Sequence, residues 1–183
     1  MIYLIIGVVI FFSVHAVPSL PVKQAMIQRV GLGPYKGLFS LLSALGLGLL
    51  IFGKGHAPFI ELWQPPVWGR HITMLLMMFT VLMLVAYLIP NNLRKLIRHP
   101  MLIAILLWSL SHLLANGDLS SAILFGSFGL FAVIDMVAVN KRSDFVKPKD
   151  VSHLFDGLTV IVAGLVYGLF FIFHRNITGM PLI

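Results

Sequence analysis

The residues best suited to chemistry lie in one stretch, RHPMLIAILLWSLSHLLANGD, which runs from Arg98 to Asp118. It sets histidines, a tryptophan, serines, an asparagine and an aspartate on an otherwise apolar segment. Polar groups inside a bilayer are costly, so those that occur there usually bind a ligand or hold helices together. We therefore expect this stretch to contain the site.

His112 is the strongest single candidate within it. On a helix, Trp108, His112 and Asn116 share a face, and Ser109 lies one turn before the histidine. Nearby hydrogen-bond partners of this kind can fix the tautomer of an imidazole that ligates a metal. A histidine that only bonds across to another helix has the same pattern, so the residues leave both interpretations open.

Other polar residues form weaker candidates. His15 lies one turn after Phe11 and shortly before a proline, where an imidazole can point into a bundle or mark the membrane interface. Arg98 and His99, beside Arg94, could contact a phosphate or a lipid headgroup, although a solvated basic loop is the favoured interpretation.

The composition indicates a membrane protein. Apolar residues make up 59% of the 183 residues and charged residues only 10%, and the mean hydropathy is +1.00. The absence of cysteine excludes disulfides, thiolate metal sites, iron–sulfur clusters and covalent c-type haem. No hydrolase, kinase or nucleotide motif occurs, so an enzyme here would act on a membrane-soluble substrate or through a cofactor.

The apolar runs predict an all-α, polytopic bundle of about six transmembrane helices, since each run can approach the roughly 30 Å of a bilayer core. We expect residues 1–183 to form a single transmembrane domain. Asn116-Gly117-Asp118 predicts a tight turn with Asp118 capping the next helix, and Asp135 is the one acid inside a span, where a structural role is favoured. The expected spans are Ile2–Val17, Gly37–Phe52, His71–Ile89, Met101–Ala115, Leu119–Val139 and Gly157–Phe173.

Small residues predict where helices pack together, and the charges in the loops predict the orientation of the chain in the membrane. GxxxG spacing at Gly33 and Gly37 and at Gly164 and Gly168 predicts close helix contacts. Basic residues follow the first, third and fifth spans, so the positive-inside rule predicts that both termini face away from the cytoplasm. Basic loops facing anionic lipid also account for the net charge of +7 without a nucleic-acid partner.

Three segments carry a family resemblance: FFSVHAVPSL, LWQPPVWGRH and RHPMLIAILLWSLSHLLANGDLSSAILFGSFG. They are similar to the NnrU family of bacterial integral membrane proteins over nearly the whole chain. The resemblance implies a place in the bacterial inner membrane and a link with nitrite and nitric oxide metabolism in denitrifiers.

The chain more distantly resembles the zeta-carotene isomerases, membrane proteins that use haem b. That resemblance implies haem b here, with His15 and His112 as iron ligands, and Ser109 stands where those enzymes suggest a cysteine. Trp108, Asn116, Arg98 and His99 complete the expected cofactor-binding residues, with arginines such as Arg98 holding propionates. Such an iron would bind or sense nitric oxide, transfer electrons or isomerise a polyene, so nitric oxide or a hydrophobic small molecule is the expected partner.

Two other classes compete with a haem protein. The RHP tripeptide also resembles small membrane methyltransferases of the isoprenylcysteine type, but NKRSDFVKPKDVSHLF matches their cofactor segment poorly. A non-catalytic accessory protein would use its histidines structurally. Binding of S-adenosylmethionine would favour the methyltransferase, and a function insensitive to loss of His15 and His112 would favour the accessory protein.

Overall fold

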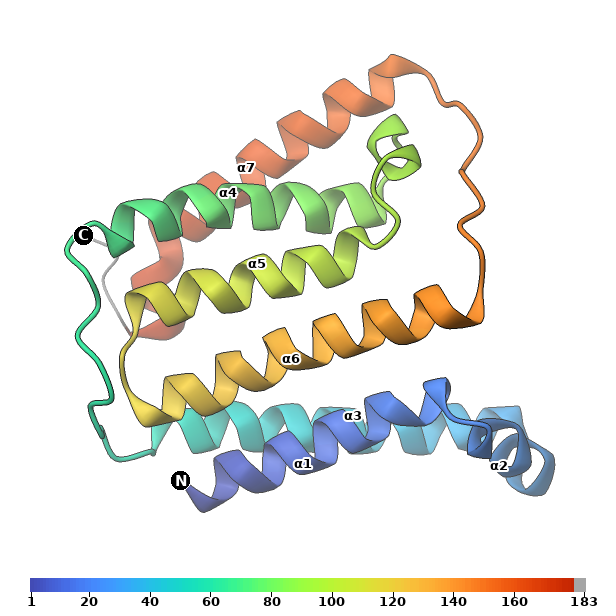
Figure 1. Ribbon diagram of the computed structural model, residues 1–183, viewed down its shortest axis with the longest axis horizontal. Helices are drawn as coiled ribbons and strands as arrows, with labels where there is room; N and C mark the ends of the chain where they lie inside the picture. The colour runs from blue at the N-terminus through green and yellow to red at the C-terminus, as the bar shows by residue number, and fades with distance from the viewer. Residues whose placement is uncertain (180–183) are drawn as a thin grey trace. The chain divides into compact units, whose positions relative to one another are not determined.

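The computed structural model describes residues 1–179, and this part of the chain is helical with no strand. Figure 1 shows the order of the helices along the chain. The α-helices are α1 (Ile2–Ala16), α2 (Val22–Val30), α3 (Leu32–Gly55), α4 (Gly69–Leu88), α5 (Pro100–Ala115), α6 (Leu119–Arg142) and α7 (His153–Thr178), with 3-10 turns η1 (Val17–Ser19) and η2 (Asn92–Lys95).

The all-α, polytopic prediction is confirmed, because each of the six expected spans corresponds to one of these helices. Five of them, α1, α3, α4, α6 and α7, are long and apolar enough to cross a membrane. The sixth, α5, has 16 residues, or about 24 Å at 1.5 Å per residue, so it is shorter than a typical bilayer core. The sequence reading missed α2, a nine-residue helix in which polar and apolar residues intermingle.

The chain divides into two compact units. The first comprises residues 1–64 and 117–127, and the second comprises residues 65–116 and the described chain from residue 128. The helix α6 therefore contributes its first residues to one unit and the rest to the other. The expectation of a single domain stays a prediction.

Glycines bring α1 and α3 together in the first unit. A Cβ on Gly53 would lie 2.3 Å from the backbone nitrogen of Leu4, and one on Gly46 would lie 2.9 Å from that of Phe11. Residues early in α1 thus meet residues late in α3, so the two helices are antiparallel, and they run side by side in Figure 1. Small residues permit such close backbone contact inside a membrane.

These contacts are not made by the glycines that the GxxxG spacing indicated. A Cβ added to Gly33, Gly37, Gly164 or Gly168 would meet no atom within 4 Å in the described part of the chain. The spacing alone did not identify the faces on which helices approach each other.

In the second unit α4 packs against both α5 and α7. The Thr73 hydroxyl of α4 donates to the backbone carbonyl of Ser111 in α5 over 2.7 Å, and both residues are buried. On the α7 side, Val81 and Val85 form an apolar cluster with Ala163, and the Tyr167 hydroxyl donates to the Met74 carbonyl over 3.0 Å. Both pairs of helices are antiparallel.

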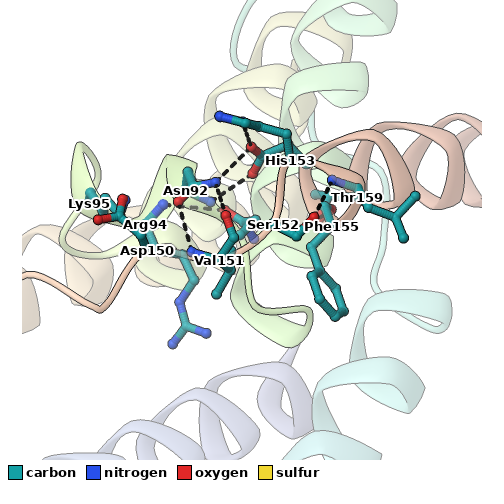
Figure 2. A network of polar contacts seen from close by, with 12 residues as sticks. Asn92, Arg94, Lys95, Asp150, Val151, Ser152, His153, Phe155 and Thr159 are labelled. Atoms are coloured by element: carbon teal, nitrogen blue, oxygen red, sulfur yellow. Dashed lines mark hydrogen bonds and ion pairs between the residues drawn. The ribbon is translucent and has the colours of Figure 1, made fainter.

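A polar network joins the loops at one end of this unit, as Figure 2 shows. The Asn92 side chain donates to the Asp156 carboxylate over 2.8 Å and to the Val151 carbonyl over 2.9 Å, and its backbone N–H donates to the same carboxylate over 2.7 Å. Lys95 forms an ion pair with Asp150. The network therefore fixes η2 against the start of α7.

Most basic residues of the second unit lie where α4 and α6 end and α5 and α7 begin, whereas Arg70 and Arg175 lie at the other end of the helices. Arg98, just before α5, donates to the carbonyl and hydroxyl of Ser143, just after α6. The other cations lie in η2, at the end of α6 and in the loop between α6 and α7. The residues concerned are Arg94, Lys95, Arg98, Lys141, Arg142, Lys147 and Lys149.

We expect Gly53→Ala to destabilise the first unit, because the new methyl group would overlap the backbone of Leu4. Overpacking of this kind costs about 1–3 kcal/mol. Gly48→Ala is the matched control, since it lies on the same helix with nothing within 4 Å of its Cβ, and it should leave stability equal or slightly higher. Thermal unfolding of detergent-purified protein measures both, and equal stability of the two variants would contradict this packing.

Candidate functional site

A cavity of about 160 Å³ lies within the second unit, walled by α4, α5 and α7. Most of its wall is apolar, and two imidazoles, those of His112 and His174, line it. The other lining residues are Thr73, Met74, Met77, Val81, Trp108, Tyr167, Phe170, Phe171, Ile177 and Thr178.

The orientation of the His112 ring is fixed by its own helix. Its Nδ1 lies 2.8 Å from the carbonyl oxygen of Trp108, and the two rings lie 5.1 Å apart. A carbonyl oxygen only accepts hydrogen bonds, so Nδ1 carries the hydrogen and the neutral ring has its lone pair on Nε2. This is the tautomer that an Nε2 metal ligand requires.

The residues expected to assist His112 behave differently from one another. Trp108 orients the imidazole through its carbonyl, and its indole packs edge-on against Phe128 of α6 at 5.4 Å. Asn116 donates to the His112 carbonyl over 2.9 Å, so it ends the helix and does not hold the ring. The Ser109 hydroxyl is buried against Gly129 and has no hydrogen-bond partner within the described residues.

His174 is a site residue that the sequence reading did not single out. It lies on the face of α7 that also carries Tyr167, Phe171 and Thr178, at helical spacing. The Thr178 hydroxyl lies 3.2 Å from its Nδ1. The helical spacing of these residues was present in the sequence. Nothing in the sequence, however, identified α4 and α5 as the helices that this face of α7 contacts.

His15 belongs to the first unit, whereas His112 belongs to the second. The Nδ1 of His15 donates to the Phe11 carbonyl over 2.7 Å, and its ring stacks on Phe11 at 4.1 Å and lies 5.3 Å from that of Phe39. His15 therefore has the same Nδ1-protonated tautomer as His112. The exposed His56 makes the same contact with the Phe52 carbonyl over 2.9 Å, so this geometry alone does not mark a ligand.

Arg98 and His99 lie at the opposite end of α5 from His112. His99 and His112 are about 20 Å apart along the helix axis at 1.5 Å per residue. Arg98 and His99 line a separate cavity, and His99 Nε2 donates to the Asn140 side chain over 2.9 Å. Their role in holding a cofactor stays a prediction.

The described residues contain no cluster of three or more histidines, aspartates and glutamates that could hold a bare metal ion. Asp135, the one acid within a span, lies 3.8 Å from Arg142 on the same helix, as a structural role would require. The nitrogen donors that line the cavity are therefore two imidazoles with apolar and aromatic surroundings.

The first unit holds a charged cluster at the turn before α6. Lys54, near the end of α3, donates to Asp118 over 3.0 Å and to the hydroxyls of Ser120 and Ser121 over 2.7 Å each. Asp118 accepts from the Ser121 backbone N–H over 2.9 Å, so its predicted role as a helix cap is confirmed. The pairing was not evident from the sequence, because Lys54 and Asp118 lie 64 residues apart along the chain.

The surroundings of Asp118 keep it ionised. Burial alone would raise the pKa of its carboxyl. Hydrogen bonds from Ser120, Ser121 and Lys54 outweigh that effect and hold the pKa well below its usual value. The carboxylate is thus a permanent negative charge at neutral pH, paired with the Lys54 ammonium. Each side chain of this cluster bonds to another member of it, which is the arrangement of a structural ion pair.

Comparison with known proteins gives one match. The family model described as NnrU protein matches residues 3–182. The chain belongs to the NnrU family. No curated protein and no solved structure matches this NnrU-family chain. The family resemblance seen in its sequence is thereby confirmed, and its apolar helices agree with a membrane location.

We expect Lys54→Met to lower the free energy of unfolding by about 2 kcal/mol, the typical loss for a hydrogen bond to a charged group. The double variant Lys54→Met, Asp118→Asn should lose less than the sum of the two single variants, because the charges are coupled. Lys36→Met, which removes an exposed lysine from the same helix, is the control and should have little effect. Denaturation followed by tryptophan fluorescence tests this, and strictly additive losses would rule out the coupling.

Proposed function

We propose that this NnrU-family protein binds haem b in the membrane, with His112 as an axial ligand of the iron. The observation that carries the proposal is the His112 imidazole itself, held on an apolar cavity wall in the tautomer with its lone pair on Nε2. Neutral imidazole is a common haem ligand, and helical bundles hold such cofactors in their cores.

The cavity fits part of this group. Trp108, Phe170, Phe171 and Met77 provide apolar and aromatic walls that would exclude water from a macrocycle. The volume of about 160 Å³ lies below the roughly 300–1,000 Å³ of sites that enclose drug-sized ligands. The cavity therefore supplies two imidazoles and part of the apolar wall, and the remaining binding surface would lie outside it.

The second axial ligand has two candidates. The resemblance to the isomerases favours His15, which has the same tautomer as His112. The cavity favours His174, because His174 and His112 both line it. In the topology proposed below, His15 lies at the cytoplasmic end of α1 and His112 lies near the other end of the membrane in α5, so one iron could not bind both. We therefore propose His174 as the second ligand, and the experiment below includes His15.

The protein residues would bind, orient and shield the group. Trp108 holds the His112 ring through its carbonyl, and the hydrogen bond from Tyr167 to the Met74 carbonyl holds α7 against α4 beside the cavity. Haem b supplies an iron that changes oxidation state and binds small gases. A role in nitrite or nitric oxide metabolism, or in a membrane redox or isomerase reaction, would follow from that chemistry.

We expect detergent-purified protein, expressed with ample haem, to show a b-type absorption spectrum that changes on reduction. His112→Ala should lose most of the bound haem, because it removes the proposed ligand. His174→Ala should lose or shift the same bands, while His15→Ala should keep them. His56→Ala is the matched control, since His56 bonds to its own helix in the same way but is exposed.

Each result separates the competing functions. Full haem content and an unchanged spectrum in His112→Ala would refute His112 as the ligand. Loss of the bands in His15→Ala but not in His174→Ala would replace the proposed second ligand. Absence of haem from the native chain, with binding of S-adenosylmethionine, would support the membrane methyltransferase, and absence of both would support an accessory protein.

We also propose that the basic end of the second unit faces the cytoplasm of a bacterial inner membrane, which puts both termini on the other side. Since the chain has no cysteine, single introduced thiols report orientation directly. Val146→Cys, which is 85% exposed at the basic end, should resist a membrane-impermeant maleimide in spheroplasts, and Gln64→Cys should react. Both should react after lysis, and the reverse pattern in spheroplasts would invert the topology.

A further inference from the structure

A second cavity, of about 390 Å³, lies at the basic end of the second unit, at the opposite end of α5 from His112. We propose that it binds the headgroup of an anionic phospholipid, with the phosphate at Arg94 and Arg98. This proposal is independent of haem binding, because the two cavities share no lining residue.

Arg98 is held in place and still has donors for a ligand. Its Nη2 donates to the Ser143 carbonyl and hydroxyl, and the guanidinium lies 5.9 Å from the centre of the Phe145 ring. A guanidinium has five N–H donors, and within the described residues the hydrogen bonds of this one all use Nη2. Its Nε and Nη1 therefore remain as hydrogen-bond donors for phosphate oxygens.

Arg94 adds a second guanidinium to the same cavity. Its backbone N–H donates to the Asn91 side chain over 3.3 Å, and within the described residues its side chain makes no ion pair. Figure 2 shows this side chain extending away from the Asn92 network, while the network holds the backbone that carries it. Arg94 is thus a positioned cation whose charge the protein does not neutralise.

The remaining walls suit a lipid better than a free anion. Met101 and Leu102, in the first turn of α5, and Val139, near the end of α6, give the cavity an apolar side that runs toward the membrane-spanning helices. A phosphate ion would make no favourable contact with that apolar surface, whereas the glycerol and upper acyl carbons of a phospholipid would cover it.

Two exposed apolar side chains mark the same end as a lipid interface. Leu96 is 81% exposed between Arg94 and Arg98, and Val146, which lines the cavity, is 85% exposed. Apolar side chains among cations are typical of segments that lie at the headgroup boundary. Basic pockets between transmembrane helices are also where anionic headgroups bind.

The Asp144 carboxylate also lines the cavity and opposes an anion. Two guanidiniums against one carboxylate leave a net positive charge, so an anionic headgroup is still favoured over a zwitterionic one. Asp144 also offers a variant that should strengthen binding, which a merely unfolded protein could not do.

The test is native mass spectrometry of the detergent-purified full chain, titrated with phosphatidylglycerol or with phosphatidylcholine of the same acyl chains. We expect tighter binding of phosphatidylglycerol. Arg94→Gln should weaken that binding about fivefold and Arg94→Gln, Arg98→Gln about 25-fold, since each basic residue near an anionic surface is worth about a factor of five. Asp144→Asn should tighten it.

Lys149→Gln is the matched control, because it removes a cation from the same end of the unit but not from the cavity lining, and it should bind phosphatidylglycerol as the native chain does. Arg94→Gln keeps every hydrogen bond of Arg98, so loss of binding in that variant is not loss of structure. Equal affinity for the two lipids, or native affinity in the double arginine variant, would overturn the proposal. Full displacement of the lipid by inorganic phosphate would assign the site to a free anion instead.

Discussion

The requirement that polar groups within a membrane find partners inside the protein governs most of this structure. Hydroxyls within the helices donate to the carbonyl one turn earlier, as Thr80 does to Leu76, Ser111 to Leu107 and Thr159 to Phe155. The imidazoles of His15 and His112 satisfy Nδ1 in the same way. This local solution explains why polar residues can be scattered along apolar helices without converging on one network, and it also fixes the tautomers of His15 and His112.

Charges follow the same requirement but are placed at the helix ends, where each finds a partner across a turn or loop. Lys54 and Asp118 join the end of α3 to the start of α6, and Asn92 and Asp156 join η2 to the start of α7. In both arrangements a few polar contacts at the helix ends hold two elements together, so no extensive polar surface is needed. The cations that remain outside such pairs, above all the Arg94 side chain, are therefore the ones available to a ligand.

Sequence patterns predicted the helices well because each span is a continuous apolar run whose ends are marked by proline, glycine or charge. They predicted residues that act through their own helix, such as His112 with Trp108 and Asp118 with Ser121. They did not predict Lys54 with Asp118, His174 in the His112 cavity, or Gly53 against Leu4, because these depend on which helix faces which. A single sequence shows which residues share a face of a helix, but it does not show which other helix that face contacts.

The short helix α5 explains why one polar stretch serves two separate sites. Its 16 residues span about 24 Å, so Arg98 and His99 at one end and His112 near the other cannot contact the same small group. Pro100 at the first turn costs no hydrogen bond, and Asn116 closes the last turn by bonding to the His112 carbonyl. The stretch therefore carries cationic residues at one end of a single helix and an imidazole that lines an apolar cavity near the other end. Because the helix is shorter than a bilayer core, both of its ends can lie within reach of molecules dissolved in the membrane.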